Sequence, residues 1–171
     1  MRLDKLTTAF QQALNEASSL ALTRDNPYVE PAHVLLAMLE QSDGPRALLE
    51  RSGANVAGLR TAMETAVNAL PSVQGGSGPQ GSRDLILLLQ AAEKEATRRG
   101  DQYVASEMFL LALADAKTDL GGVVRGHGLT RKSLEGAIEA VRGGAKVDSA
   151  EAEGQREALK KYTLDLTERA R

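Results

Sequence analysis

The chain has 171 residues, of which 21 are basic, 23 are acidic and none is cysteine. The near balance of charge leaves no single-sign field for a phosphate backbone or an anionic lipid, so we expect neither nucleic acid nor a membrane as a partner. Without cysteine the chain has no disulfide and no thiolate nucleophile or ligand. The apolar runs are too short to cross a bilayer and the start lacks a signal-peptide core, so we expect a cytoplasmic protein.

Composition also favours one fold class. Aromatic residues make up only 3% of a chain that is 42% hydrophobic, so Leu, Val and Ala must build the core. Leu and Ala form helices readily, whereas strands favour β-branched and aromatic residues. We therefore expect an all-α fold with no sheet.

Four helices are expected in the first 70 residues. Apolar residues at helical spacing and local start and stop signals place them at about 3–25, 31–39, 44–53 and 56–70. Asp4 is placed to cap the first helix and Asn55 the fourth, while Gly53 can take the left-handed conformation after the third.

Four more helices are expected after a turn-rich linker at 71–82, at about 83–99, 106–116, 120–125 and 131–142. Ser82 can cap the first of these, and Gly100 can end it. Residues 143–156 are rich in Gly, Ala and small polar residues without apolar periodicity, which predicts a flexible linker.

The second half repeats the first. Aligning residues 9–66 with 84–141 at a constant offset of 75 gives 13 identities, among them Tyr28 with Tyr103 and Gly53 with Gly128. This pattern indicates a duplicated four-helix unit, with repeat one at 1–70 and repeat two at 82–142. Since each half alone buries little surface, we expect the two repeats to pack about a pseudo-two-fold axis as one domain at 1–142.

Signs of catalysis are nearly absent. His33 lies inside an apolar helical run and His127 in a glycine-flanked turn, so both are interpreted as structural residues rather than metal ligands. Ser106 followed by Glu107 has the pattern of a capped helix start. The glycine-rich segments lack the spacing of a phosphate-binding loop. We expect no enzyme activity, no metal and no cofactor in this chain.

One helix face differs between the repeats. The helix at 83–99 carries Ile86 and Leu87 where the first helix has Gln11 and Gln12. Leu87 and Ala91 lie one turn apart beside the core-facing stripe. Two interpretations stay open at this point: the wider apolar stripe contacts the other repeat, or it forms a binding groove.

Several stretches carry a family resemblance. "MRLDKLTTAFQQALNEASSLAL", "NPYVEPAHVLLAMLEQ", "RRGDQYVASEMFLLAL" and "EALKKYTLDLTERAR" together resemble the amino-terminal domain and following linker of ClpB-type bacterial disaggregases. These belong to the Clp N-domain family of AAA+ unfoldases. By this resemblance, residues 157–171 lead into a first ATPase module that the chain does not contain.

The resemblance implies a role in protein disaggregation. Members of the family are homohexameric heat-shock chaperones that bind ATP and magnesium, carry a coiled coil, and thread aggregated proteins together with the DnaK system. This chain would capture exposed apolar segments of unfolded or aggregated clients for refolding, and would itself be a monomer. The implied client-binding residues are Thr7, Asp101, Glu107, Ala91 and Met108.

The implied groove lies between the start of the first helix and the helices at 83–99 and 106–116. Its apolar floor would comprise Leu87, Ala91 and Met108, with Glu95 and the small Ala91 departing from the family's apolar pattern. Each polar candidate also has a structural interpretation: Thr7 as a first-turn bond, Asp101 as a turn residue and Glu107 as a helix-start acid. An adaptor-docking domain of a protease-associated Clp unfoldase and a purely structural cap on the ATPase ring remain alternatives.

Overall fold

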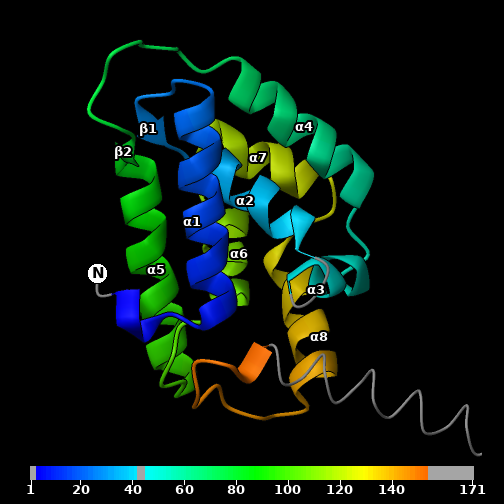
Figure 1. Cartoon of the computed structure of the whole chain (residues 1–171). Helices are drawn as coiled ribbons and strands as arrows, with labels where there is room; N and C mark the ends of the chain where they lie inside the picture. The colour runs from blue at the N-terminus through cyan, green and yellow to red at the C-terminus, as the bar shows by residue number, and fades with distance from the viewer. Residues whose placement is uncertain (1–2, 42–44, 154–171) are drawn as a thin grey trace, which may run out of the picture.

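The computed structural model describes residues 3–41 and 45–153, and over these ranges the fold is helical (Figure 1). The first repeat contributes α1 (Thr8–Thr23), α2 (Pro31–Glu40), α3 (Pro45–Arg51) and α4 (Val56–Asn68). The second contributes α5 (Arg83–Arg99), α6 (Ser106–Asp115), α7 (Asp119–Gly126) and α8 (Arg131–Arg142). The predicted eight helices in two successive sets of four are confirmed.

Most predicted helix ends are also correct. The side chain of Asn55 caps α4 by accepting from the Gly58 N–H, and Ser82 caps α5 by accepting from the Leu85 N–H. Gly53 and Gly100 take positive φ angles of 80° and 79° after α3 and α5. These ends were predictable because each signal acts within one turn of the helix that it ends.

The prediction for the start of α1 was wrong. Thr7, not Asp4, caps this helix, with its Oγ1 accepting from the Phe10 N–H at 3.3 Å. Asp4 lies in a separate 3-10 helix, η1 (Leu3–Lys5). The chain between them is held by backbone bonds from Thr7 N–H to Val104 O and from Val104 N–H to Lys5 O. A long-range pairing therefore delays the helix start.

The expectation of no sheet was also wrong, in a small but informative way. β1 (Tyr28–Val29) and β2 (Gln80–Gly81) form a parallel two-stranded sheet, and Leu6 bridges to Val104 in the same parallel sense. At the 75-residue offset the two pairings are equivalent. The segment just before the first helix of each repeat, here called its entry segment, therefore pairs with the other repeat. This pairing satisfies backbone N–H and C=O groups that lie outside the helices. Two-residue strands leave too little pattern to be read from sequence.

The two repeats meet again at equivalent loops. The Asn55 N–H donates to the His127 carbonyl at 2.9 Å, so the loop before α4 contacts the loop before α8. Gly128 has φ 90°, and a side chain there would begin 3.4 Å from the Ala54 Cα. Contact between matching loops is what a pseudo-two-fold arrangement requires.

One core joins both repeats. Phe10 from α1 and Phe109 from α6 are both fully buried, with ring centroids 5.9 Å apart. Within the repeats α1 packs on α2 and α5 on α6, while α3 contacts α8 across the repeat boundary. The core is therefore shared rather than divided into two small ones.

The segment after α8, residues 143–153, is here called the strap. It turns back beneath the helix ends at the bottom of Figure 1, and Val147 and Glu153 within it are only 2% exposed. Bonds to distant residues hold the strap in this position, and its own composition does not reveal them. The flexibility that composition predicts for the linker at 143–156 stays a prediction. The rest of that linker and the segment at 157–171 lie outside the described residues.

Adjacent glycines in α7 give the first testable prediction. Gly121→Ala is expected to destabilise by about 1–3 kcal/mol, because its Cβ would lie 2.1 Å from the Ala116 carbonyl oxygen and the backbone would have to move. Gly122→Ala is the matched control: its Cβ meets only the Arg125 side chain at 3.9 Å, so alanine should stabilise the helix by up to about 1 kcal/mol. Urea unfolding of both variants checks the opposite signs, and equal effects would contradict the geometry.

Candidate functional site

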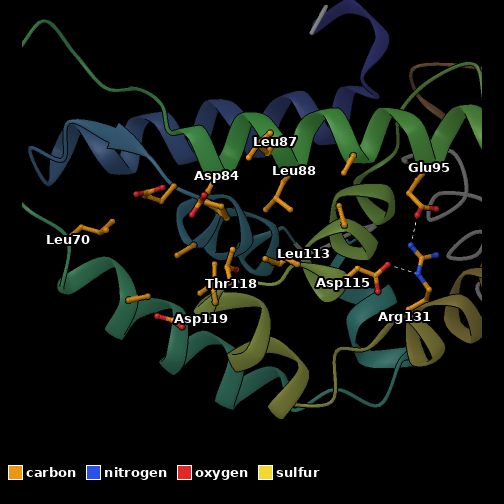
Figure 2. A pocket seen from close by; sticks show the side chains of 18 residues that line it. Leu70, Asp84, Leu87, Leu88, Glu95, Leu113, Asp115, Thr118, Asp119 and Arg131 are labelled. Carbon is orange, nitrogen blue, oxygen red and sulfur yellow. Dashed lines mark hydrogen bonds and ion pairs between the residues drawn. The ribbon is translucent and has the colours of Figure 1, made fainter.

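A groove of about 750 Å³ runs along α5. Figure 2 shows Leu88 projecting from α5 into it, with Leu70 at one end and Leu113 on the opposite wall, and Leu87 of α5 also lines it. Its other walls come from the start of α2, the end of α4 and the turn between α6 and α7, and include Ala112, Ala116, Thr118 and Leu120. The groove therefore lies where both repeats meet.

The apolar surface of the groove is partly open to solvent. Leu87 is 51% exposed although Leu88, the next residue, is buried at 9%. Ala91 lines the groove one turn further along α5 and is half-buried. The wider apolar stripe on α5 had two interpretations, contact with the other repeat or an open groove. Leu87 fits the groove, because a leucine side chain that is half exposed is not covered by the other repeat.

Carboxylates surround this apolar surface. Glu30, Asp84, Glu95, Asp115 and Asp119 line the groove, and Arg131 is the basic residue among its lining. The charge balance of the lining is therefore acidic, and it would attract cationic groups and repel anionic ones.

Arg131 is already engaged by acids. Its guanidinium pairs with Glu95, with Asp115 at 2.6 Å and with Glu135 at 3.0 Å. The hydrogen bond to Glu95, opposed by some desolvation, raises the pKa of Arg131 above its usual value. The pairing explains how Glu95, only 6% exposed, occupies a position where the family resemblance implies an apolar residue. The dashed lines in Figure 2 mark two of these contacts.

The polar candidates lie together elsewhere, at the starts of α1 and α6. Thr7 is fully buried and its hydroxyl donates to Glu153 Oε1 at 2.6 Å. Asp101 accepts from the Arg142 guanidinium at 2.9 and 3.1 Å, and Glu107 accepts from Arg142 Nε at 3.0 Å. All three side chains are therefore buried and bonded to other parts of the domain.

Met108 does not line the groove. It is fully buried in the core, within a helix whose residues from Ser106 to Ala114 are all buried. No residue of α1 lines the groove; besides α5 and α6, its lining comes from α2, α4, α7 and Arg131. Client binding between the start of α1, α5 and α6 stays a prediction. Of the six candidates, the structure brings Leu87 and Ala91 to the groove and Thr7, Asp101 and Glu107 to the other cluster.

Sequence reasoning missed Arg131, Arg142 and Glu153. A signal existed for Arg131, because a glutamate inside an apolar stripe requires a buried cationic partner. The partners of Arg142 and Glu153 lie 35 to 146 residues away along the chain, so no local signal existed for either residue. Charged residues of that kind look like ordinary surface residues until the chain is folded.

His33 has the structural role expected of it. Its Nδ1 accepts from the Glu30 N–H at 2.9 Å, in a capping box at the start of α2, and its Nε2 contacts Asn26 Oδ1 at 2.9 Å. Burial lowers its pKa below the usual value, and nearby Arg24 lowers it further. A neutral imidazole donating from Nε2 satisfies both contacts.

Among the described residues there is no group of three or more His, Cys, Asp or Glu side chains that would hold a metal ion. Within the same part of the chain, no helix has the length and hydropathy needed to cross a membrane.

The fold therefore consists of two four-helix repeats that exchange their entry segments, with an open groove along α5. Residues 5–126 match the family model described as the Clp repeat (R) N-terminal domain. The chain belongs to the Clp N-terminal domain family. It is 44% identical, over 99% of its length, to the chaperone protein ClpB of Pseudomonas putida, and it spans about 20% of that relative.

Solved Clp N-domains show the same fold. The N-terminal domain of Hsp104 from Candida albicans superposes with a TM-score of 0.74 at 21% identity, over 87% of this chain and 99% of that domain. A ClpV N-domain in complex with a VipB peptide superposes with a TM-score of 0.66 at 23% identity, over 80% and 86%. At these identities the likeness establishes the fold of the Clp N-domain.

Proposed function

We propose that this domain captures exposed apolar segments of unfolded or aggregated proteins for a ClpB-type disaggregase. The segments would be held in the α5 groove and passed to AAA+ modules that thread them at the expense of ATP. The observation that carries the proposal is Leu87, a half-exposed leucine that lines a groove of about 750 Å³. Pockets of this size typically hold a few side chains of a ligand.

The charges of the groove suggest which segments it takes. Glu30, Asp84 and Asp119 also line the groove, and Arg131, the basic residue of the lining, is engaged by Glu95 and Asp115. Apolar segments flanked by Lys or Arg would gain from these charges, whereas acidic segments would be repelled.

The residues proposed to touch the client are Leu87 and Ala91. Thr7, Asp101, Glu107 and Met108 are covered by the protein itself, so client contact at these four remains a prediction that requires the covering parts to move. The contacts of Thr7, Asp101 and Glu107 within the domain support a structural role for each of these three polar residues. Thr7 in particular is a helix cap.

A relative supports peptide binding by this fold, because a ClpV N-domain has been solved in complex with a VipB peptide. Capture of one extended segment over a few side chains should be micromolar or weaker, about 6–8 kcal/mol, after the segment is ordered. The proposed parent is a homohexamer, and several copies around a ring would raise the overall affinity by avidity. The ATP, magnesium, DnaK partnership and cytoplasmic location belong to that proposed parent.

A matched pair of α5 variants tests the groove. Leu87→Asp should weaken binding of an unfolded casein by about tenfold or more, because it places an unpaired carboxylate on the apolar surface that the client covers. Ile86→Asp is the control, since Ile86 is 47% exposed on the same helix but does not line the groove. Both positions are exposed, so the thermal midpoint should barely change.

Binding is measured by NMR titration of the whole chain, which also locates the client. Equal affinity for the two variants and the parent would reject the groove. Adaptor docking is the second candidate, favoured by the single defined peptide in the ClpV complex. Saturable one-to-one binding to one folded partner, with no binding of casein, would establish that candidate instead.

A further inference from the structure

The strap protects four backbone N–H groups that the rest of the domain leaves unbonded. The Val147 carbonyl accepts from Gln102 N–H at 2.8 Å and Tyr103 N–H at 3.2 Å, and the Ala150 carbonyl accepts from Thr8 N–H at 2.8 Å. Glu153 Oε1 accepts from Ser106 N–H at 2.8 Å. Thr8 and Ser106 are the first residues of α1 and α6, where no carbonyl within the helix is available to an N–H.

Two side chains anchor the strap. Val147 is buried at 2% exposure, and its own N–H donates to Asp101 Oδ1 at 3.0 Å. The Glu153 carboxylate, also 2% exposed, accepts hydrogen bonds from the Thr7 hydroxyl and from the Ser106 N–H at the start of α6. A carboxylate at a helix N-terminus is favoured by the exposed N–H groups and by the helix dipole.

The strap is built so that it can leave without unfolding the domain. Only two of its eleven residues, Val147 and Glu153, are buried. It begins at Gly143 and Gly144, both with positive φ, where the chain can turn freely. When it leaves, the four N–H groups and the Thr7 hydroxyl face water, which can satisfy them.

We propose that the strap is a latch with docked and released states, which sets how far the domain can move from the chain that follows residue 153. Docked, the strap itself lies against the starts of α1 and α6. Released, its eleven residues span roughly 18 Å as a flexible coil, and about 38 Å at full extension. The latch works through contacts separate from the α5 groove, so it stands or falls independently of client capture.

Amide hydrogen exchange of the whole chain tests this proposal, with internal references. Thr8, Gln102, Tyr103 and Ser106 report the latch, because their N–H groups bond only to the strap in this structure. The N–H groups of Thr7 and Val104 lie beside them but bond within the domain. If the strap opens locally, the four latch amides should have protection factors at least about tenfold lower than the two references.

Val147→Asp should release the latch, because it places a charge at the buried anchor. The protection factors of the four amides should then fall by a further tenfold or more, whereas those of Thr7 and Val104 should not change. Glu151→Ala is the control, since Glu151 is an exposed acidic residue of the same strap. Latch amides that exchange together with the references in the parent, or that Val147→Asp leaves unchanged, would overturn the proposal.

Discussion

Replacing Arg142 by alanine is expected to lower the free energy of unfolding by about 3–5 kcal/mol, because it removes the guanidinium that the buried carboxylates of Asp101 and Glu107 both contact. The side chains of Arg142, Asp101 and Glu107 are 6%, 0% and 3% exposed. Burial lowers the pKa of Arg142, but the charges and hydrogen bonds of the two acids outweigh it and raise the value overall. In a domain of this size, such a loss should lower the thermal midpoint by roughly 6–20 °C.

The exposed pair of Arg46 and Glu50 supplies the control. Their side chains are 44% and 58% exposed, so Arg46→Ala should change stability by at most about 1 kcal/mol. Adding Asp101→Asn and Glu107→Gln to Arg142→Ala should recover part of the loss, since these changes remove the two carboxylate charges that Arg142 contacts. An Arg142→Ala variant within about 1 kcal/mol of the parent in urea unfolding would show that water reaches these carboxylates.

Phe10→Ala is expected to destabilise the whole chain by about 3–5 kcal/mol, in a single transition that includes both repeats. The Phe10 ring is fully buried against Phe109 of the other repeat, so the cavity lies in the core that joins them. Leu22→Ala is the control on the same helix, because Leu22 is 59% exposed and should be nearly neutral.

The unfolding of each repeat is followed by amide signals from α2 and from α8. Light scattering checks separately that the chain is a monomer, as expected. Coincident transitions at both helices are expected, because helices from both repeats contribute to one hydrophobic cluster. A variant in which α8 keeps its parental midpoint while α2 unfolds early would mean that the repeats are independent units.

Helix positions were predictable because their determinants are local. The cap at Ser82, the left-handed Gly53 and the proline start at Pro31 each act within one helical turn, and all appear as expected. The duplication was predictable for another reason: a constant offset is visible in the sequence without knowledge of any contact.

The candidate site was only partly predictable. Leu87 stood out because it is apolar where the first repeat has Gln12, and it lines the groove. Met108 had the same apolar character but faces the core, and sequence alone does not separate an apolar residue in a groove from one in the core. Whether such a side chain reaches solvent depends on which helix packs over it.

The sequence by itself determined the helices, most of their ends and the two-repeat organisation, because these follow from propensities, caps and repetition within short stretches. Only the tertiary structure decided which charges are buried together and where the chain crosses between repeats. Arg142 meets Asp101 and Glu107, and Glu153 meets Thr7, across 35 to 146 residues. Contacts of that range have no local periodicity, since their partners become neighbours only when both repeats close on one core.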